Sequence, residues 1–181
     1  MNNNYYIADV FTQEKFNGAQ IAVFPKAENL SDSQMQLLAR ELNLSETVFV
    51  VPDSAKKNHF KVRIFSPQNE IDFAGHPIIA TAYVLASSGE LQLTDGHNPL
   101  TLEQNIGSID VNVTSNNGQP SFVQFTQQVS AVVDRFAPTD QELSELLSID
   151  CKAIDTKKYS TRLVSCGFPY LIVPVFNYET V

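Results

Sequence analysis

The clearest hydrophobic pattern in the chain lies between residues 60 and 89. Residues 60–65 alternate apolar and basic side chains, which is the period of two expected of a half-buried strand. Residues 78–86 are apolar at every position but one, with Pro77 suited to the first helical position and Gly89 to helix termination. A helix without a polar face should be enclosed by other elements, and about a dozen residues are too few to span a membrane. The pattern therefore predicts a strand, a loop and a buried central helix near residues 77–88.

Shorter patterns on either side predict the remaining elements. Capping boxes that begin at Ser31 and at Thr139 mark the starts of two amphipathic helices, because each is followed three residues later by Gln or Glu. Runs of apolar, β-branched and aromatic residues indicate the strands. The expected strands are residues 5–10, 21–24, 47–51 and 60–65, a hairpin of 109–113 with 122–125, and 170–175; the expected helices are 33–42, 77–88 and 139–148.

The order of elements suggests a duplication. Strand, helix and strand occur in this order up to residue 51, and again around the helix at residues 139–148, although the likeness is one of pattern more than of identity. The second copy stops before its own counterpart of residues 60–89. We therefore expect a first lobe at residues 1–115, which holds the central helix, and a partial second lobe at residues 116–181.

Composition and charge exclude several classes of partner. The 181 residues are 43% hydrophobic and 18% charged, which is enough apolar material for a packed core. The net charge of −8 and the lack of a basic cluster argue against nucleic acid and against anionic membranes. No stretch resembles a signal peptide or reaches transmembrane length, so a cytoplasmic protein is expected. Cys151 and Cys166 fit neither a disulfide framework nor a zinc site, and we expect both to be core thiols.

The candidate chemistry is acid–base catalysis. The three histidines share no metal-ligand spacing, and no nucleophile elbow, phosphate loop or dinucleotide motif is present. Glu46 enters a strand among apolar neighbours, and His76 follows Gly75 at the start of the central helix, where free N–H groups favour a carboxylate or phosphate. Simpler interpretations remain open: Glu46 faces solvent, Gly75 only permits a tight turn, and His76 caps or packs.

Four runs of sequence carry a resemblance to a known family. These runs are FTQEKFNGAQIAVF, LNLSETVFV, RIFSPQNEIDFAGHPIIATAYVL and the weaker SCGFPYLIVPV. Together they resemble the PhzF-like phenazine biosynthesis family, whose diaminopimelate-epimerase-like fold has two similar halves, each a barrel-like sheet around a central helix. The resemblance implies an α+β fold with an incomplete second lobe and a site between the halves. It also implies that Glu46 is the acid–base residue and that Gly75 and His76 contact the substrate.

Two departures narrow the expected activity. Ala74 stands where epimerases and racemases of the wider fold have a catalytic cysteine, so two-cysteine racemisation is not expected. Ala19 follows Gly18 where the family commonly has asparagine, which removes an amide that could contact substrate. The resulting expectation is an isomerase that moves a proton on a small carboxylated metabolite, with neither cofactor nor metal. The alternative is a non-catalytic fragment or a small-anion-binding module.

The last expectation concerns assembly. In a partial second lobe, the strands near residues 122–125 and 171–175 would lack neighbours and leave apolar side chains in contact with water. We therefore expect a homodimer or a complementary C-terminal segment, with the contact centred on Leu171, Val173 and Val175.

Overall fold

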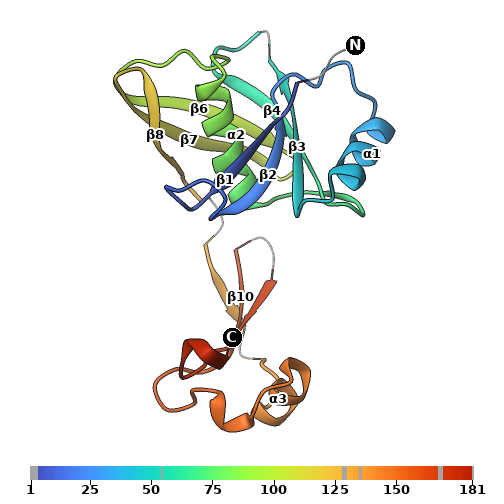
Figure 1. Ribbon diagram of the computed structural model, residues 1–181, viewed down its shortest axis with the longest axis vertical. Coiled ribbons are helices and arrows are strands. Elements are labelled where there is room, and N and C mark those ends of the chain that lie inside the picture. Colours follow the sequence, from blue (N-terminus) through green and yellow to red (C-terminus); the bar gives the residue numbers. More distant parts are fainter. Residues whose placement is uncertain (1–3, 54, 128–129, 135, 167–168, 181) are drawn as a thin grey trace. The chain divides into compact units, whose positions relative to one another are not determined.

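The computed structural model describes residues 4–53, 55–127, 130–134, 136–166 and 169–180, and the chain forms two compact units, Met1–Thr126 and Gln127–Val181 (Figure 1). Unit 1 contains β1 (Tyr6–Val10), β2 (Ala19–Phe24), α1 (Asp32–Leu42), β3 (Glu46–Pro52), β4 (His59–Phe65), β5 (Glu70–Ile71), α2 (Gly75–Ser87), β6 (Gly96–Gln104), β7 (Gly107–Asn116) and β8 (Gln119–Phe125). Unit 2 contains β9 (Val132–Asp134), α3 (Asp140–Leu147), β10 (Arg162–Ser165), β11 (Pro169–Ile172) and the 3₁₀ turns η1 (Cys151–Ala153) and η2 (Tyr178–Thr180).

Unit 1 is built on one mixed, eight-stranded sheet. Its strands run in the order β1-β2-β3-β4-β6-β7-β8, with β5 paired to β4. The pairs β2–β3 and β4–β6 are parallel, and the other neighbours are antiparallel. The parallel pair β2–β3 requires a crossover, which α1 supplies. This arrangement confirms the expected α+β class.

The central helix α2 fills the inner face of the curled sheet, and strands pass both in front of it and behind it (Figure 1). Ile78, Leu85 and the small residues between them are buried against apolar side chains from most of the strands. The one hydroxyl in this apolar stretch, on Thr81, donates to the carbonyl of Pro77 at 2.7 Å and so is satisfied within the helix. The expectation that this helix is enclosed is confirmed.

Helix α1 covers the opposite face of the sheet. Met35 and Ala39 pack on the phenylalanines of three neighbouring strands, and the rings of Phe24 and Phe49 stack with centroids 4.9 Å apart. Because α2 lies on one side and α1 on the other, residues 47–50 of β3 are all buried. This explains why that strand is an unbroken apolar run rather than an alternating one.

The bounds of α2 differ from the sequence prediction. The helix begins at Gly75 with Ala74 as its N-cap, whereas we expected Pro77 to be the first helical residue. Proline is tolerated in the third position because none of the first N–H groups of a helix has an intrahelical acceptor. At the other end Gly89, with φ +83°, follows the C-cap and confirms the predicted stop.

The hairpin β7–β8 places the boundary between the two units later than expected. Asn116 pairs with Gln119 across Asn117-Gly118, both with positive φ, which is the two-residue turn that suits a twisted hairpin. Strand β8 is therefore part of the first sheet, and the division falls after Thr126 instead of after residue 115.

Unit 2 does not repeat the crossover of unit 1. Its antiparallel sheet has the order β11-β10-β9, and β10 and β11 form a hairpin. The strand expected at residues 170–175 is observed as Pro169–Ile172, and its neighbour is β10 rather than the strand that precedes α3. Unit 2 therefore does not share the parallel pairing of the β2–α1–β3 crossover.

The cysteines are not core thiols, contrary to expectation. Cys166 is exposed and Cys151 is only partly buried, and both are free thiols. Within the described ranges, no helix is long and apolar enough to cross a membrane.

Candidate active site

The candidate site lies at the edge of the unit 1 sheet where β2 and β3 begin. These strands are parallel, with Ile21 opposite Glu46, so their first residues share one edge. Strand β4 ends at the same edge, because Thr47 is opposite Phe65. The chain then passes through β5 into the first turn of α2. This topology brings the start of β3 and the N-terminus of α2 together.

Glu46 and His76 form a direct pair at this edge. The imidazole Nε2 of His76 lies 2.9 Å from Oε2 of Glu46. The side chains are 15% and 31% exposed for Glu46 and His76 respectively, so water reaches both only in part. The open alternative that Glu46 is a solvent-facing strand residue is therefore wrong. The sequence indicated Glu46 and His76 as separate candidate residues, and the structure shows that their side chains are in contact.

The pair shifts the pKa of both groups. Burial raises the pKa of Glu46, but hydrogen bonds from His76 and Ser45, with the charge of His76, outweigh burial and hold the pKa below its usual value. The hydrogen bond to Glu46 raises the pKa of His76, against the opposing effect of burial. Both shifts favour the carboxylate–imidazolium form. Ser45 was missed by sequence reasoning, since its only signal was its position beside Glu46.

The first turn of α2 has no side-chain cap. The N-caps of α1 and α3, Ser31 and Thr139, each accept an N–H from their own helix in a capping box. The N-cap of α2 is Ala74, which has no side-chain acceptor to offer. Its first N–H groups therefore remain suited to an oxyanion from a ligand.

The backbone conformation at position 75 does not require a glycine. Its φ lies outside the left-handed region, so the open alternative of a tight turn that only glycine permits is wrong. A Cβ at this position would meet only the ring of Phe125 on β8, at 3.4 Å from Cζ. An alanine at this position would therefore make an ordinary contact with the Phe125 ring.

The connection between β1 and β2 reaches the same edge, because β2 begins there. Asp9 Oδ2 accepts the N–H of Phe16 at 2.9 Å and so holds this connection. Phe11 and Phe16 are 78% and 88% exposed and both have positive φ, which is uncommon for bulky residues. At Gly18 a Cβ would meet the carbonyl oxygen of Val10 at 2.5 Å, so glycine is required there.

In the described part of the chain, no group of three His, Cys, Asp or Glu side chains could hold a metal ion. The arrangement at the edge is instead a carboxylate and an imidazole beside free helix N–H groups. Such a set can accept and return a proton and can hold an anionic group.

Comparison with known proteins identifies the family. The profile of the PhzC-PhzF family, described as phenazine biosynthesis-like protein, matches residues 8–181. The chain belongs to this family. An uncharacterised isomerase of Mesorhizobium japonicum is 35% identical over 97% of the chain and 57% of its own length. The trans-2,3-dihydro-3-hydroxyanthranilate isomerase of Pseudomonas fluorescens is 35% identical over 92% of the chain and 58% of its own length.

Structural comparison agrees with this assignment. The crystal structure of a PhzF-family phenazine biosynthesis protein from Bacillus anthracis matches with a TM-score of 0.84 and 25% identity, over 98% of the chain and 57% of that structure. This confirms the expected diaminopimelate-epimerase-like fold. The chain spans somewhat more than half the length of these PhzC-PhzF relatives.

Proposed function

We propose that the protein is a cofactor-independent isomerase that moves a proton within a small carboxylated metabolite. The observation that carries the proposal is the 2.9 Å pair between Glu46 and His76, half-buried beside an uncapped helix N-terminus. Membership of a family that includes isomerases supports the reaction class.

Glu46 is the proton carrier in this proposal. Its lowered pKa keeps the carboxylate ionised near neutral pH, so it can accept a proton from a substrate carbon. One C–H bond breaks, the electron pair moves through the adjacent double bond, and Glu46 returns a proton to a different carbon after its carboxyl proton has exchanged with solvent. Proton and electrons are conserved, so the step requires no oxidant or reductant.

The start of α2 holds the substrate's carboxylate. The N–H groups of Gly75 and His76 and the positive end of the helix dipole complement an oxyanion, and Ala74 does not compete for them. The absence of a Cβ at Gly75 lets the carboxylate approach the backbone closely. His76 is a positioning residue, because its contact orients Glu46 and keeps it ionised.

The test is proton exchange in deuterated buffer. The first compound to assay is trans-2,3-dihydro-3-hydroxyanthranilate, the substrate in the name of the Pseudomonas fluorescens relative. Glu46→Gln should keep the fold and slow exchange by about 10²–10⁴-fold, the usual contribution of a positioned acid–base group. Glu103→Gln is the matched control, because Glu103 also faces a histidine, His59 at 3.7 Å, but lies outside the site. A Glu46→Gln variant as fast as the parent would show that the assignment is wrong.

Binding separates the isomerase from the alternative of a small-anion-binding module. If the protein is a small-anion-binding module, the metabolite binds at α2 without deuterium exchange, and Glu46→Gln leaves the affinity for the metabolite unchanged. Gly75→Ala should weaken binding under either function, because its Cβ occupies the space beside the first N–H groups. Exchange by the chain on its own would exclude the non-catalytic alternative.

A further inference from the structure

A cavity that is open to solvent lies within unit 2. It has a volume of about 510 Å³ and is lined by residues 157–160, Arg162, Ile172 and Pro174. This volume falls in the range of about 300–1,000 Å³ typical of small-molecule sites. The cavity shares no residue with the Glu46–His76 pair, and the inference drawn from it does not rest on the proposed isomerase function.

The lining of this cavity is positively charged. Lys157, Lys158 and Arg162 all border it, and the lining includes no carboxylate. Among the described residues, none of the three takes part in a salt bridge. The cavity thus gathers three cations in a chain of net charge −8. Their mutual repulsion is relieved when an anion binds between them.

The backbone that presents the lysines is held in place by Asp155. This carboxylate is 7% exposed, and its Oδ1 accepts the N–H groups of Lys157 and Lys158 at 2.9 and 3.0 Å. The N–H of Asp155 donates to the carbonyl of Pro174 at 2.9 Å, which ties the two walls of the cavity together. The nearest carboxylate in the sequence thus accepts hydrogen bonds from backbone groups, which holds the backbone of the lysine pair in place.

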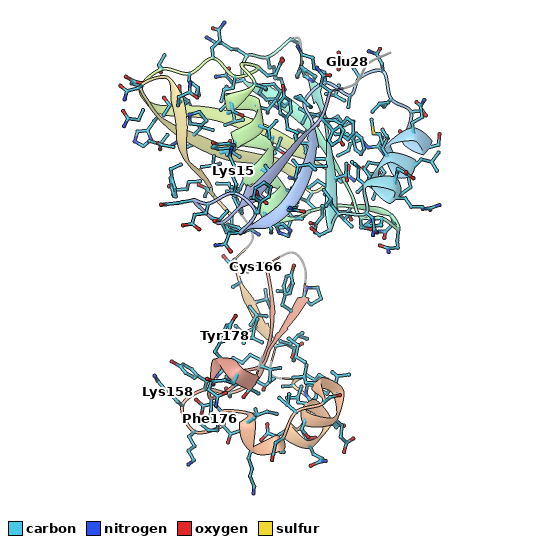
Figure 2. The ribbon with its side chains drawn as sticks, in the orientation of Figure 1. Lys15, Glu28, Lys158, Cys166, Phe176 and Tyr178 are labelled. Atoms are coloured by element: carbon cyan, nitrogen blue, oxygen red, sulfur yellow. The ribbon has the colours of Figure 1, made fainter. Side chains whose placement is uncertain are left out.

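The remaining lining suits a flat organic group. Tyr159 is exposed, and Nζ of Lys158 lies 5.1 Å from the centroid of its ring. Ile172 and Pro174 supply an apolar surface on the β11 side. Lys158 lies at the periphery of unit 2, where a ligand can reach it from solvent (Figure 2).

We propose that this cavity binds a phosphorylated metabolite with a planar ring, of the size of a nucleoside diphosphate. Lys157, Lys158 and Arg162 neutralise the phosphates, because a diphosphate places several charges within reach of all three. The hydroxyl of Ser160 donates an additional hydrogen bond. The ring of the ligand stacks on Tyr159, as aromatic side chains do with nucleobases.

The experiment is calorimetric titration of the full chain with ADP and, separately, with inorganic pyrophosphate, in metal-free buffer. The triple variant Lys157→Gln, Lys158→Gln and Arg162→Gln replaces the three cations with shorter, neutral polar side chains and so removes the charges. Lys152→Gln is the matched control, since Lys152 belongs to the same unit but does not line the cavity. Tyr159→Ala tests the stacking contact.

We expect saturable ADP binding that weakens at least about tenfold in the triple variant and is unchanged in Lys152→Gln. Affinity for both ligands should fall as salt rises, because salt screens exposed charges. Tyr159→Ala should weaken ADP binding and leave pyrophosphate binding unaltered. The proposal is overturned if ADP does not bind, if the triple variant binds it as tightly as the parent, or if pyrophosphate and ADP respond equally to Tyr159→Ala.

Discussion

The two units of the chain use their sheets in different ways. The sheet of unit 1 is covered by α2 on its inner face and by α1 on its outer face, and both hydrophobic clusters belong to this unit. In the described part of unit 2, the buried apolar side chains are only Leu143 and Ile154. Strands β9 to β11 leave Val132, Tyr170 and Ile172 exposed.

The difference shows what a sheet needs in order to be buried. An apolar strand is stabilised only when another element covers its face, and in unit 1 that element is a helix with almost no polar side chain. Helix α3 is amphipathic and contributes one buried leucine, Leu143, to unit 2. Unit 2 therefore derives more of its order from backbone pairing and turns, such as the bridge between Ile154 and Val175, than from a core.

The largest expected effect is on the core of unit 1. Leu85→Ala removes a fully buried side chain from α2 and should lower the free energy of unfolding by about 2–5 kcal/mol. Chemical denaturation followed by circular dichroism measures the loss. Leu146→Ala on the exposed side of α3 is the matched control and should change stability by about 0.5 kcal/mol or less. Equal losses would contradict the contrast between the two units.

The next effect concerns the uncovered strands of unit 2. The sequence predicts self-association or a complementary segment centred on Leu171, Val173 and Val175, which are partly buried within unit 2. Val173→Lys should shift a dimer towards monomer or unfold the unit, since it removes about 1.5–3 kcal/mol of apolar burial and adds an unpaired charge. Light scattering over a concentration series measures the shift, with Leu37→Lys on the exposed side of α1 as control. A stable monomer of the parent at high concentration, with no co-purifying segment, would overturn this prediction.

A third prediction compares two glycines at the edge of unit 1. Gly18→Ala places a Cβ 2.5 Å from the carbonyl oxygen of Val10, so the backbone must move at a cost of about 1–3 kcal/mol. Gly75→Ala meets only an ordinary contact with Phe125, and in a helix it should stabilise by up to about 1 kcal/mol. Thermal unfolding of both variants measures the difference. If Gly75→Ala destabilised as much as Gly18→Ala, Gly75 would have a structural role.

The smallest effect is the pH dependence of the Glu46–His76 pair. Because the pKa of Glu46 is lowered, its stabilisation is complete above the ordinary value of about 4.3 and is lost as pH falls through the lowered pKa. Because the pKa of His76 is raised, its stabilisation is complete below about 6.5 and is lost as pH rises through the raised pKa. The pair should therefore stabilise unit 1 most between these values.

NMR titration of the His76 imidazole tests this directly. In Glu46→Gln the pKa of His76 should fall, because the hydrogen bond to a carboxylate and its charge are removed. Glu103→Gln should leave the His76 titration as it is in the parent. An unchanged pKa of His76 in Glu46→Gln would show that the pair does not form in solution.

Most local elements could be predicted because their signals are local. The capping boxes at Ser31 and Thr139 placed α1 and α3 nearly correctly, since a cap satisfies N–H groups within its own turn. The start of α2 was misplaced by two residues because Ala74 gives no capping signal. The prediction that both cysteines are buried was wrong, because residue type alone does not specify whether another element covers a side chain.

The sequence by itself determined that an enclosed helix lies near residues 77–88, because an apolar residue on every side leaves no face for water. It also made Glu46 and His76 individual candidates. Only the tertiary structure decided that they meet, since the residues are thirty positions apart and their contact depends on the antiparallel pairing of β3 with β4, which leads into α2. Tertiary structure likewise decided that β10 and β11 form an antiparallel hairpin, which the order of elements in the sequence did not specify. Strand pairing depends on which chain segments lie beside each other, and the period of two within a strand is the same in parallel and antiparallel pairs.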